Sequence, residues 1–366
     1  MTSARAIDVL LPVYNAEATL ALSLESLSNQ SFTNFRIIAI NDGSTDGSLD
    51  ILRAFAGHDE RIDIVNLANG GIVRALNTGL SHVTAPIVAR LDADDLCDPD
   101  RLDRQYAFLN RRPDHVAVGG RVEHIDEHGR TVHGLPHPGD PEEADPWRVP
   151  AREPYIVHPF LMARASAMRS AGGYRHVPHS EDSDLFWRLR DHGKLHNLSA
   201  VVGQYRLHSG SISGASIVGG RVMAIGSQLG ALAARRRERG LPDRGFPTDL
   251  IARLAEARTL GAMGEVVAAE VDVPERDRFR LATGMKLLEL SAYRPYEIEE
   301  SDANFIGTAC RTIGALQLPP GNATEINWHL TQTAARLLRS GRLGAARRLL
   351  PRSLWPKAVA KAVLRA

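Results

Sequence analysis

Short runs rich in valine, isoleucine and leucine alternate with helical patterns through the first third of the chain. The apolar runs lie at residues 7–13, 35–40, 62–67, 86–91 and 115–118. Helical periodicity occupies the intervals between them, at residues 16–27, 48–55, 72–82 and 101–110. Strands that take turns with helices of this length predict a parallel sheet covered by helices. We therefore expect a doubly wound α/β fold in this part of the chain.

The pattern is less regular in the next hundred residues. Residues 121–150 are rich in proline, glycine, histidine and aspartate, which predicts a hairpin and a long loop. Strand-like patterns return at residues 156–163 and 195–207, with a helical pattern at 181–191 between them. These elements extend the predicted α/β region.

A second change of character follows. From Arg221 onward the sequence is helical and rich in alanine, leucine and arginine, with breaks at prolines and glycines. This shift predicts two domains, an α/β domain at residues 1–214 and an all-helical domain at residues 215–366.

Charge and cysteine content narrow the classes of function. The 366 residues carry a formal net charge of +1, so the chain offers no strong field for nucleic acid, and it has no zinc-finger spacing. Its two cysteines, Cys97 and Cys310, are too few for a disulfide framework. The first apolar stretch is interrupted by Asp8 and Pro12, and no later one approaches 18 apolar residues. We expect a cytoplasmic protein without a signal peptide or a membrane span.

Polar and acidic residues follow three of the predicted strands. They are the segments Tyr14–Glu17, Asn41–Asp46 and Asp92–Asp95. In an open α/β sheet the carboxyl ends of the strands form the ligand site, so these segments are the first candidates. The first strand lacks the G-x-G-x-x-G pattern that a dinucleotide-binding domain needs, which argues against a nicotinamide enzyme. Residues 42–53 imitate a calcium-binding loop, but Arg53 stands where a bidentate glutamate is required.

The segment Asp92–Asp95 carries three carboxylates within four residues. One interpretation is a helix N-terminus, which favours acidic side chains, since a helix is predicted just beyond. That interpretation leaves the crowded carboxylates to repel one another. Oxygen ligands at this density suit Mg²⁺ or Mn²⁺ holding a diphosphate.

Five strings give the sequence a family resemblance. They are the segment from Asp8 to Leu52 with NDGSTDGS, then GGIVRALNTGL, ARLDADDLCDPDRL, GGYRHVPHSEDSDLFWRL and QYRLHSGSIS. In this order and spacing they resemble the motifs of family-2 inverting glycosyltransferases with the GT-A fold, of the bacterial polysaccharide-biosynthesis type. The resemblance covers residues 5–214. It implies transfer of a sugar from a nucleotide-sugar to an acceptor hydroxyl, with a GT-A-type Rossmann-like sheet and a Mn²⁺ or Mg²⁺ cofactor.

The resemblance assigns the donor-binding residues of the first half. Pro12, Tyr14 and Glu17 would line the base and ribose, and Asp42 would hydrogen-bond the base edge, which is usually uracil. An aromatic face can stack on a base, and a carboxylate accepts an imide N–H. Arg74 would contact the base or a phosphate, although the family often places an arginine beside the asparagine of this motif and here leucine stands there. A solvated helix arginine is the alternative.

The metal and diphosphate contacts come from two later motifs. Asp92 would meet the ribose or the metal, and Asp94 would ligate the metal that bridges the diphosphate. Asp95 would support these contacts or cap the following helix. Arg206 would meet the diphosphate, and His208 would be a further metal ligand or a structural residue. His208 also opens a serine- and glycine-rich stretch that could close over the donor as a lid.

The acceptor hydroxyl needs a general base, because an alcohol is a poor nucleophile until it loses its proton. Asp182 matches the base position of the family, and Glu181 beside it is the fallback. The alternative is a pair of acids at a helix N-terminus. Direct attack opposite the leaving group inverts the anomeric configuration without a covalent intermediate.

Two other functions share parts of this pattern. A nucleotidyltransferase that makes nucleotide-sugars would share the nucleotide site and the acidic loop, but its glycine-rich phosphate loop is missing after the first strand. A catalytically silent sugar-nucleotide-binding protein would not need Asp94 and Asp182. The acceptor is expected to be a saccharide or a lipid-linked saccharide.

The end of the chain is basic. Nine arginines and lysines follow Glu325, with no acidic residue among them. Such a segment can lie on an anionic bilayer, with Leu349, Leu350 and Trp355 at its boundary. The alternative is a basic helical pair that packs on its own domain. The first interpretation predicts a peripheral contact with the inner membrane face.

Overall fold

The computed structural model describes residues 5–134, 137–207, 216–294 and 296–364. The chain forms two compact units, which we describe separately. Unit 1 comprises residues 1–143, 154–175 and 185–208, and unit 2 comprises 144–153, 176–184 and 209–366. The boundary predicted between residues 214 and 215 stays a prediction, because it falls outside the described residues.

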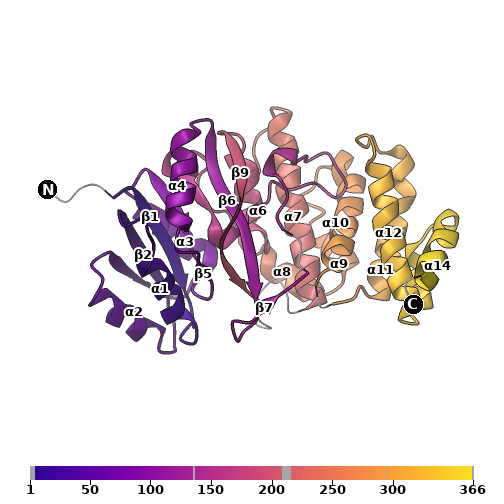
Figure 1. Cartoon of the computed structure of the whole chain (residues 1–366). Coiled ribbons are helices and arrows are strands. Elements are labelled where there is room, and N and C mark those ends of the chain that lie inside the picture. Colours follow the sequence, from indigo (N-terminus) through magenta and orange to yellow (C-terminus); the bar gives the residue numbers. More distant parts are fainter. Residues whose placement is uncertain (1–4, 135–136, 208–215, 295, 365–366) are drawn as a thin grey trace. The chain divides into compact units, whose positions relative to one another are not determined.

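Unit 1 is built on a sheet whose first half is parallel (Figure 1). Its strands follow the order β3-β2-β1-β4, with bounds Ile62–Leu67, Phe35–Asp42, Ile7–Val13 and Ile87–Arg90. The helices between and after them are α1 (Leu20–Ser28), α2 (Ser48–Ala56), α3 (Ile72–Ser81) and α4 (Arg101–Arg111). The predicted alternation of strands and helices is confirmed.

The second half of the sheet is mixed. It continues from β4 through β8, β6 and β9 to β5, with bounds Met162–Arg164, His115–Ile125, Lys194–Arg206 and Leu96–Cys97. Strand β8 runs antiparallel to both β4 and β6, β9 is parallel to β6, and β5 is antiparallel to β9. The predicted hairpin is formed by β6 and the short strand β7, Thr131–Val132. Strands β6 and β9 therefore run in the same direction as the first four strands, and the predicted parallel arrangement is interrupted by β8, β5 and β7.

Most of the strand predicted at residues 156–163 is not a strand in the structure. The segment contains a 3₁₀ turn, His158–Phe160, and only its end joins β8. Pro159 lies in that turn, and proline cannot donate a hydrogen bond to a strand ladder. Short helices complete unit 1: a 3₁₀ turn at Pro141–Glu143, α5 at Ala165–Ser170 and α6 at Glu181–Leu189, which begins in unit 2.

Helices cover both faces of the sheet, as the α/β fold predicts. Alternate residues of β1 point to opposite sides: Val9 and Leu11 join a core with α1 and α4, whereas Leu10 joins a core with α3, α5 and α6. Period-two alternation between two apolar layers requires both faces to be buried. The carboxyl ends of the strands stay available for a ligand site.

A buried ion pair fixes the other end of the sheet. Asp8 of β1 is fully buried, and Arg36 of β2 donates to both of its oxygens at 2.9 and 2.8 Å. The backbone N–H groups of Thr84 and Ala85 donate to it as well. Burial alone would raise the pKa of Asp8, but the bonds from Arg36 and the two N–H groups outweigh it and lower the pKa below its ordinary value.

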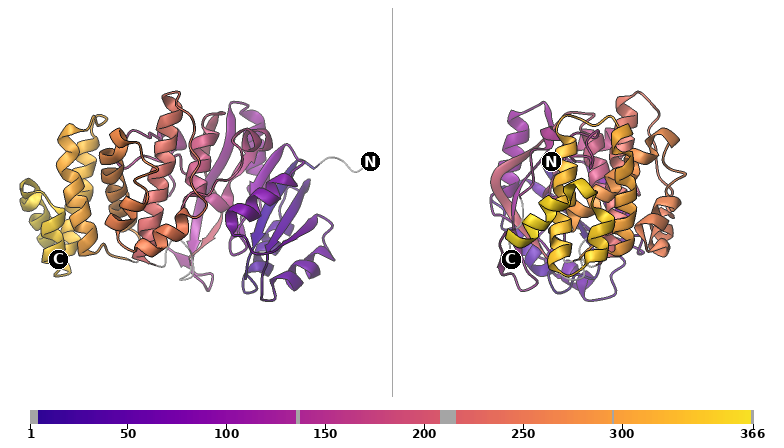
Figure 2. Two further views of the ribbon diagram at one scale, coloured as in Figure 1. Left: turned by 180° about the vertical axis from the view of Figure 1, so that it is seen from behind. Right: turned by 90° about the vertical axis from the view of Figure 1, so that its right-hand side faces the viewer.

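Unit 2 is helical from residue 217 to 364, which confirms the predicted helical C-terminal region. Its α-helices are α7 (Ile217–Glu238), α8 (Leu250–Ala257), α9 (Leu260–Val266), α10 (Arg276–Leu290), α11 (Glu300–Ala309), α12 (Asn322–Arg339), α13 (Leu343–Leu349) and α14 (Trp355–Leu364). Helix α10 packs against both α7 and α12, and the view from behind shows it between them (Figure 2, left). Leucine, isoleucine and alanine side chains of these helices form one core.

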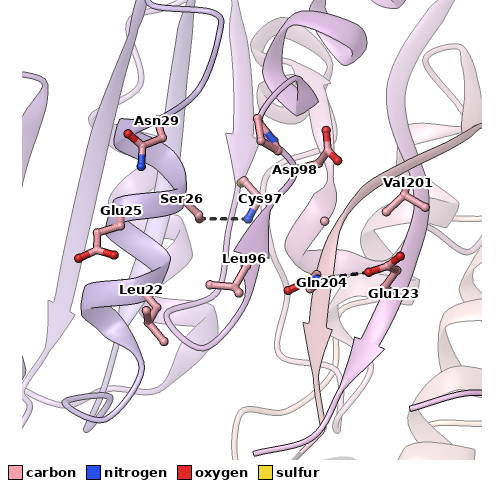
Figure 3. A pocket seen from close by; sticks show the side chains of 12 residues that line it. Leu22, Glu25, Ser26, Asn29, Leu96, Cys97, Asp98, Glu123, Val201 and Gln204 are labelled. Atoms are coloured by element: carbon pink, nitrogen blue, oxygen red, sulfur yellow. Dashed lines mark hydrogen bonds between the residues drawn. The ribbon is translucent and has the colours of Figure 1, made fainter. Parts of the chain in front are cut away.

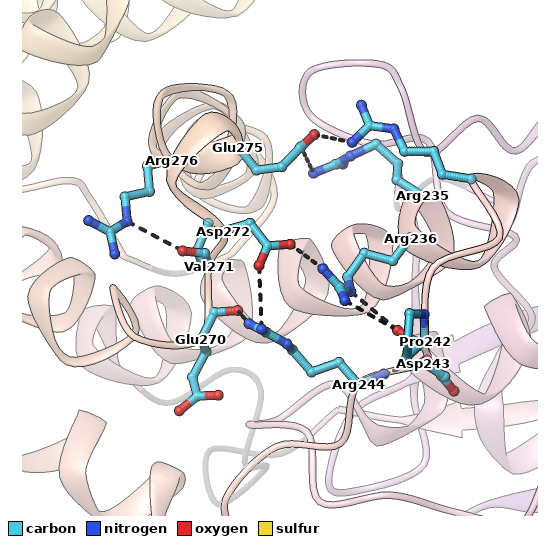
Figure 4. Close-up of polar contacts among 11 residues, drawn as sticks. Arg235, Arg236, Pro242, Asp243, Arg244, Glu270, Val271, Asp272, Glu275 and Arg276 are labelled. Carbon is cyan, nitrogen blue, oxygen red and sulfur yellow. Dashed lines mark hydrogen bonds and ion pairs between the residues drawn. The ribbon is translucent and has the colours of Figure 1, made fainter.

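Arginines at the end of α7 and in the loop after it pair with acidic residues at and just before the start of α10 (Figure 4). Arg235 is 2% exposed and pairs with Glu275 at 3.1 Å, and burial lowers its pKa to about 10. Arg236 and Arg244 both pair with Asp272. These three arginines of unit 2 thus have a structural use.

Helix α7 is the one described helix that is long and apolar enough to cross a membrane. In its most apolar window 78% of the residues are buried inside the structure. A core helix of a folded domain passes the same test, so this is weak evidence for a span. The sequence-based expectation of no span stays a prediction.

Candidate functional site

The loops that follow β1 and β2 are interlocked by hydrogen bonds. The Asn15 backbone N–H donates to Ser44 Oγ at 3.1 Å, and the Thr45 N–H donates back to Asn15 Oδ1 at 2.8 Å. The Ala16 N–H donates to Ser48 Oγ at 2.8 Å. Asn15 has a φ of 47°, a left-handed conformation that asparagine tolerates better than most residues. The sequence motifs include these polar residues, but their pairing across 30 positions was not predicted.

Glu17, predicted to line the nucleotide, also belongs to this lock. Its Oε2 accepts the Gly47 N–H at 2.7 Å, next to the first residue of α2. Its own N–H donates to Asp46 Oδ2 at 3.1 Å. Pro12 is buried in β1, whereas Tyr14 is 53% exposed at the strand end. Tyr14 therefore presents an aromatic face on the side where the strands end.

Asp42 ends β2 and is held by the loop before α3. It is 4% exposed, and its two oxygens accept the backbone N–H groups of Gly70 and Gly71 at 3.0 and 2.8 Å. Arg74 is exposed on α3, and its Nη1 donates to Ala68 O at 3.0 Å. Asp42 and Arg74, the two residues predicted to contact the nucleotide base, thus both bond to the loop at residues 68–71. The bond from Arg74 to Ala68 also orders this loop.

Asp92, Asp94 and Asp95, the acidic cluster, gather just after β4. One carboxylate oxygen from each lies within 4.8 Å of the others. Asp92 Oδ1 pairs with Arg90 Nη2 at 2.5 Å. Asp95 is 1% exposed, its Oδ1 accepts the Arg206 N–H at 2.7 Å, and its Oδ2 has no hydrogen-bond partner among the described residues.

The electrostatics of the acidic cluster are unfavourable without a cation. Burial, together with the charges of Asp94 and Asp92, raises the pKa of Asp95 well above its ordinary value. Burial also raises the pKa of Asp92, with a contribution from Asp94, although Arg90 opposes the shift. Carboxylate oxygens are the ligands that Mg²⁺ and Mn²⁺ prefer. The three side chains and the unpartnered buried oxygen therefore fit a divalent cation.

Arg206 braces the acidic cluster from behind. Its guanidinium group is buried, with Nε donating to Asp94 O at 2.8 Å and Nη1 to Asp126 O at 3.0 Å. These bonds give it a structural role in the loop, and its predicted contact with the diphosphate stays a prediction. His208 and the predicted lid that it opens lie outside the described residues.

His158 is a structural residue. Its Nε2 is 2.9 Å from the Tyr174 hydroxyl, and both side chains are buried. Burial, together with the charge of Arg90, lowers the pKa of His158 well below its ordinary value. A neutral, buried imidazole of this kind is part of the packing.

Asp182 and Glu181 are the first two residues of α6, and both are half-buried. The Ser183 N–H donates to Asp182 Oδ1 at 2.7 Å, at a helix start that favours ionised carboxylates. Both acids belong to unit 2. Their predicted role as the base is not tested by these contacts.

A cavity of about 460 Å³ lies elsewhere in unit 1 (Figure 3). It is lined by residues of α1, β5, β6 and β9, including Glu25, Ser26 and Gln204. Among the described residues predicted to bind the donor or the metal, none lines it. Leu96 and Cys97, which line it, follow the acidic cluster directly in the chain.

Comparisons with known proteins agree with the fold. The family described as Glycosyl transferase family 2 matches residues 8–171. The putative glycosyltransferase EpsE of Bacillus subtilis is 37% identical over 202 residues, which cover 53% of this chain and 69% of that protein. The amylovoran biosynthesis glycosyltransferase AmsE of Erwinia amylovora is 31% identical over 211 residues, which cover 56% and 78%.

Solved structures show the same fold at low sequence identity. The mannosyltransferase PcManGT of Pyrobaculum calidifontis, in complex with GDP-Man and Mn²⁺, has a TM-score of 0.52 at 17% identity, covering 100% of this chain and 88% of that one. TarS 1-349 of Staphylococcus aureus, in complex with UDP-GlcNAc, has a TM-score of 0.51 at 16% identity, with 92% of both chains covered.

The fold and the match over residues 8–171 define the class of this protein as a glycosyltransferase with a GT-A-like fold. More particularly, the chain belongs to glycosyltransferase family 2. Membership favours sugar transfer over nucleotidyl transfer, the alternative that the sequence left open.

Proposed function

We propose that this protein transfers a sugar from a nucleotide-sugar, of the UDP class, to a hydroxyl group of a saccharide or lipid-linked saccharide acceptor, with inversion at the anomeric carbon. The observation that carries the proposal is the acidic cluster, whose three carboxylates meet at the end of β4. The names of relatives support the setting, since AmsE acts in amylovoran biosynthesis and the 28% identical WbnJ of Escherichia coli in O-antigen biosynthesis. We infer that this chain also acts in bacterial surface polysaccharide biosynthesis.

The donor's base and ribose are assigned to the interlocked loops. Tyr14 offers a stacking face, and Asp42 is an ionisable acceptor at the strand end. Glu17 and Arg74 complete the predicted set, each with a bond that also orders its own loop. Because hydrogen bonds already order these loops, the loops lose less conformational entropy when the donor binds.

The diphosphate is assigned to the acidic cluster through Mn²⁺ or Mg²⁺. Asp94 and Asp92 are the proposed ligands, and Asp95 supports them from a buried position. A divalent cation held by these residues would act as a Lewis acid and neutralise the charge on the departing diphosphate. Arg206 holds the backbone of Asp94 in place by its bond to the carbonyl oxygen.

The proton of the acceptor hydroxyl is assigned to Asp182, with Glu181 as the fallback. As the acceptor oxygen bonds to the anomeric carbon, the bond from that carbon to the diphosphate oxygen breaks, and the hydroxyl proton passes to the Asp182 carboxylate. The nucleoside diphosphate leaves with the electron pair. One displacement of this kind inverts the configuration, and it needs no covalent enzyme intermediate.

The basic end of the chain is proposed to make a peripheral contact with the inner membrane face. The structure changes which residues can take part: Leu349 and Leu350 are buried in the core of unit 2, so the sequence-based choice of these two was wrong. Trp355 is half-buried and packs against the same core. The exposed apolar residues are Val359, Val363 and Leu364 of α14, at 46, 70 and 83% exposure.

A donor screen tests the proposed function. UDP-glucose, UDP-galactose, UDP-GlcNAc, GDP-mannose and dTDP-glucose are incubated with the full chain in Mn²⁺ or in EDTA, and released nucleotide is measured. We expect release from one or more donors in Mn²⁺ and little in EDTA. Nucleotide binding without release from any donor would instead support a catalytically silent sugar-nucleotide-binding protein.

A further inference from the structure

Residues 176–184, the base segment, carry Asp182 and belong to unit 2. Their first anchor is α7. An added Cβ on Gly226 of α7 would lie 1.9 Å from Pro178 O, so the segment rests directly on the helix backbone at that glycine. Ser180 Oγ donates to Met223 O, one turn earlier, at 3.3 Å. The start of the base segment is thus seated against one helix at two points.

The second anchor is a buried network of polar side chains. Ser183, the residue after Asp182, donates its hydroxyl to Glu153 Oε1. Glu153 Oε2 pairs with Lys286 Nζ of α10 at 2.6 Å, and the two side chains are only 11 and 10% exposed. Lys286 also donates to Glu289 at 3.1 Å. We call Ser183, Glu153 and Lys286 the serine–glutamate–lysine network.

The electrostatics of this network keep both partners charged. Burial would raise the pKa of Glu153, but Lys286 and the hydrogen bonds outweigh it and lower the pKa. Burial would lower the pKa of Lys286, but Glu153 and Glu289 raise it well above its ordinary value. A buried ion pair adds little stability compared with apolar residues of the same size. The pair does fix the orientation of its side chains, because each buried polar atom needs a hydrogen-bond partner.

Glu153 is itself fixed by the chain before it. Residues 144–153, the strap, belong to unit 2, and Val149 is fully buried in its core. Val149 exchanges two hydrogen bonds of 2.9 Å with the side chain of Asn322 on α12. The Ala151 N–H donates to Gln228 Oε1 of α7 at 3.2 Å. The strap therefore holds Glu153 at a set place among α7, α10 and α12.

From these contacts we propose that the helical unit positions the catalytic base, with Ser183, Glu153 and Lys286 as positioning residues that fix the rotation of the first turn of α6. The inference rests on the proposed function, in which Asp182 takes the acceptor proton. It gives the strap and the helices α7 and α10 a use in the reaction, beyond filling a hydrophobic core. Donor binding is not assigned to this network.

The test uses Ser183→Ala in the full chain, because it removes one hydroxyl and leaves the buried ion pair intact. We expect kcat for nucleotide release, with the best donor of the screen, to fall about tenfold to a hundredfold, as misplacement of a reacting group does. KM for that donor and the affinity for UDP should stay unchanged. Ser183→Thr, which keeps a hydroxyl, should restore most of the lost kcat. Ser291→Ala removes a buried hydroxyl just after α10 that donates to Leu288 O and accepts from Arg336, and it should leave kcat unchanged.

A double variant separates positioning from a general loss of structure. If Ser183 acts through Asp182, Asp182→Asn/Ser183→Ala should be no slower than Asp182→Asn alone. The positioning role would be overturned if the double variant lost kcat by the product of the two single losses, or if Ser183→Ala had a normal kcat. Either result would leave the base assignment in place. Normal kcat in Asp182→Asn would overturn the base assignment itself and the inference with it, and the single variants tell these two failures apart.

Discussion

The acidic cluster of unit 1 and the serine–glutamate–lysine network of unit 2 handle buried negative charge in opposite ways. Glu153 has its lysine and its serine, and its pKa is lowered. Asp95 has an unpartnered oxygen among the described residues and two acidic neighbours, and its pKa is raised well above normal. The network finds its partners within the chain, whereas the cluster leaves a buried oxygen of Asp95 without one among the described residues, and a divalent cation, as proposed above, would supply it. A strained site of this kind is where function is expected.

The largest expected effect is the loss of turnover on substitution of Asp182, the proposed base beside the serine–glutamate–lysine network. Asp182→Asn keeps the shape of the side chain but cannot accept the acceptor proton, so turnover should fall by about 10² to 10⁴, the usual worth of a general base. Donor affinity, measured by titration with UDP, should stay within about twofold, since the substitution leaves the donor residues untouched. Asp191→Asn, just beyond the end of the same helix, is the control. Near-normal turnover in Asp182→Asn would remove Asp182 from the reaction.

A paired carboxylate outside the site sharpens the comparison. Asp8→Asn removes the buried charged acceptor of two backbone N–H groups and of Arg36, which keeps only its exposed acidic partner, so the free energy of unfolding should fall by about 2–4 kcal/mol. Asp63 pairs with the same Arg36 but is 54% exposed, and Asp63→Asn should cost about 0–1 kcal/mol. Urea unfolding at pH 7 measures both. An equal fall in the free energy of unfolding in the two variants would show that burial of Asp8 does not determine how much it stabilises the protein.

The pH dependence of this pair follows from the lowered pKa of Asp8. A carboxylate whose pKa is lowered by folding stabilises the protein above its ordinary pKa of 3.8. That stability is lost as pH falls through the folded pKa. The difference between the wild type and Asp8→Asn should therefore be constant near neutral pH and shrink below about pH 4.

The crowded carboxylates predict a change of the opposite sign. Asp95→Asn removes a buried charge and keeps an oxygen for the Arg206 N–H, so in EDTA at pH 7 the free energy of unfolding should rise by about 1 kcal/mol or more. Because folding raises the pKa of Asp95, the wild type loses stability as pH rises above 3.8, and the gain should vanish at low pH. Mn²⁺ should stabilise the wild type more than the variant. Lower stability of Asp95→Asn in EDTA would contradict this account of the cluster.

The smallest effect extends the comparison to positive charges. Arg336 and Arg348 are paired with Glu297 and Glu300, so they are less available to a membrane than the exposed Arg352 and Lys357. At about 1 kcal/mol for each basic residue near the surface, binding to anionic vesicles at low salt should weaken when both exposed residues are changed to glutamate.

The vesicle experiment uses phosphatidylglycerol-rich liposomes and the full chain. Arg352→Glu/Lys357→Glu should pellet less than the wild type, and 0.5 M salt should release the wild type as well. Arg111→Glu/Arg112→Glu, with the same charge change on exposed residues of unit 1, is the matched control. Equal pelleting of the wild type and both variants would count against α14 and the turn before it as a membrane contact.

The sequence predicted the parts of the fold and site that depend on local patterns. Strand and helix periodicity placed β1 to β4 and α1 to α4 within a few residues, and the carboxyl ends of the strands pointed to Asp42 and the acidic cluster. Short-range spacing also put Asp182 at a helix start. These features are local because a strand end and the loop that follows it are neighbours in the chain.

What the sequence did not predict depends on contacts between distant residues. Nothing near Glu153 indicates its pairing with Lys286, and the strap resembles an ordinary proline-rich loop. Arg206 follows a strand pattern that predicts neither its burial nor its bonds to backbone carbonyls. Leu349 and Leu350 stand in a segment of leucines and arginines that suggests an amphipathic surface helix. Packing of α13 against α11 and α12 buries both leucines instead. Tertiary packing decides such cases, and local propensity does not.

The measurement that tests the central claim most directly is calorimetric titration of UDP into the full chain, in Mn²⁺ and in EDTA, for the wild type and Asp94→Asn. The account predicts that Mn²⁺ tightens UDP binding to the wild type by about tenfold or more, or about 1.4 kcal/mol, and that Asp94→Asn loses this gain. Asp100→Asn, a half-exposed carboxylate that pairs with Arg104, should keep it. The same gain from Mn²⁺ in Asp94→Asn as in the wild type would contradict a metal-dependent donor site at the acidic cluster.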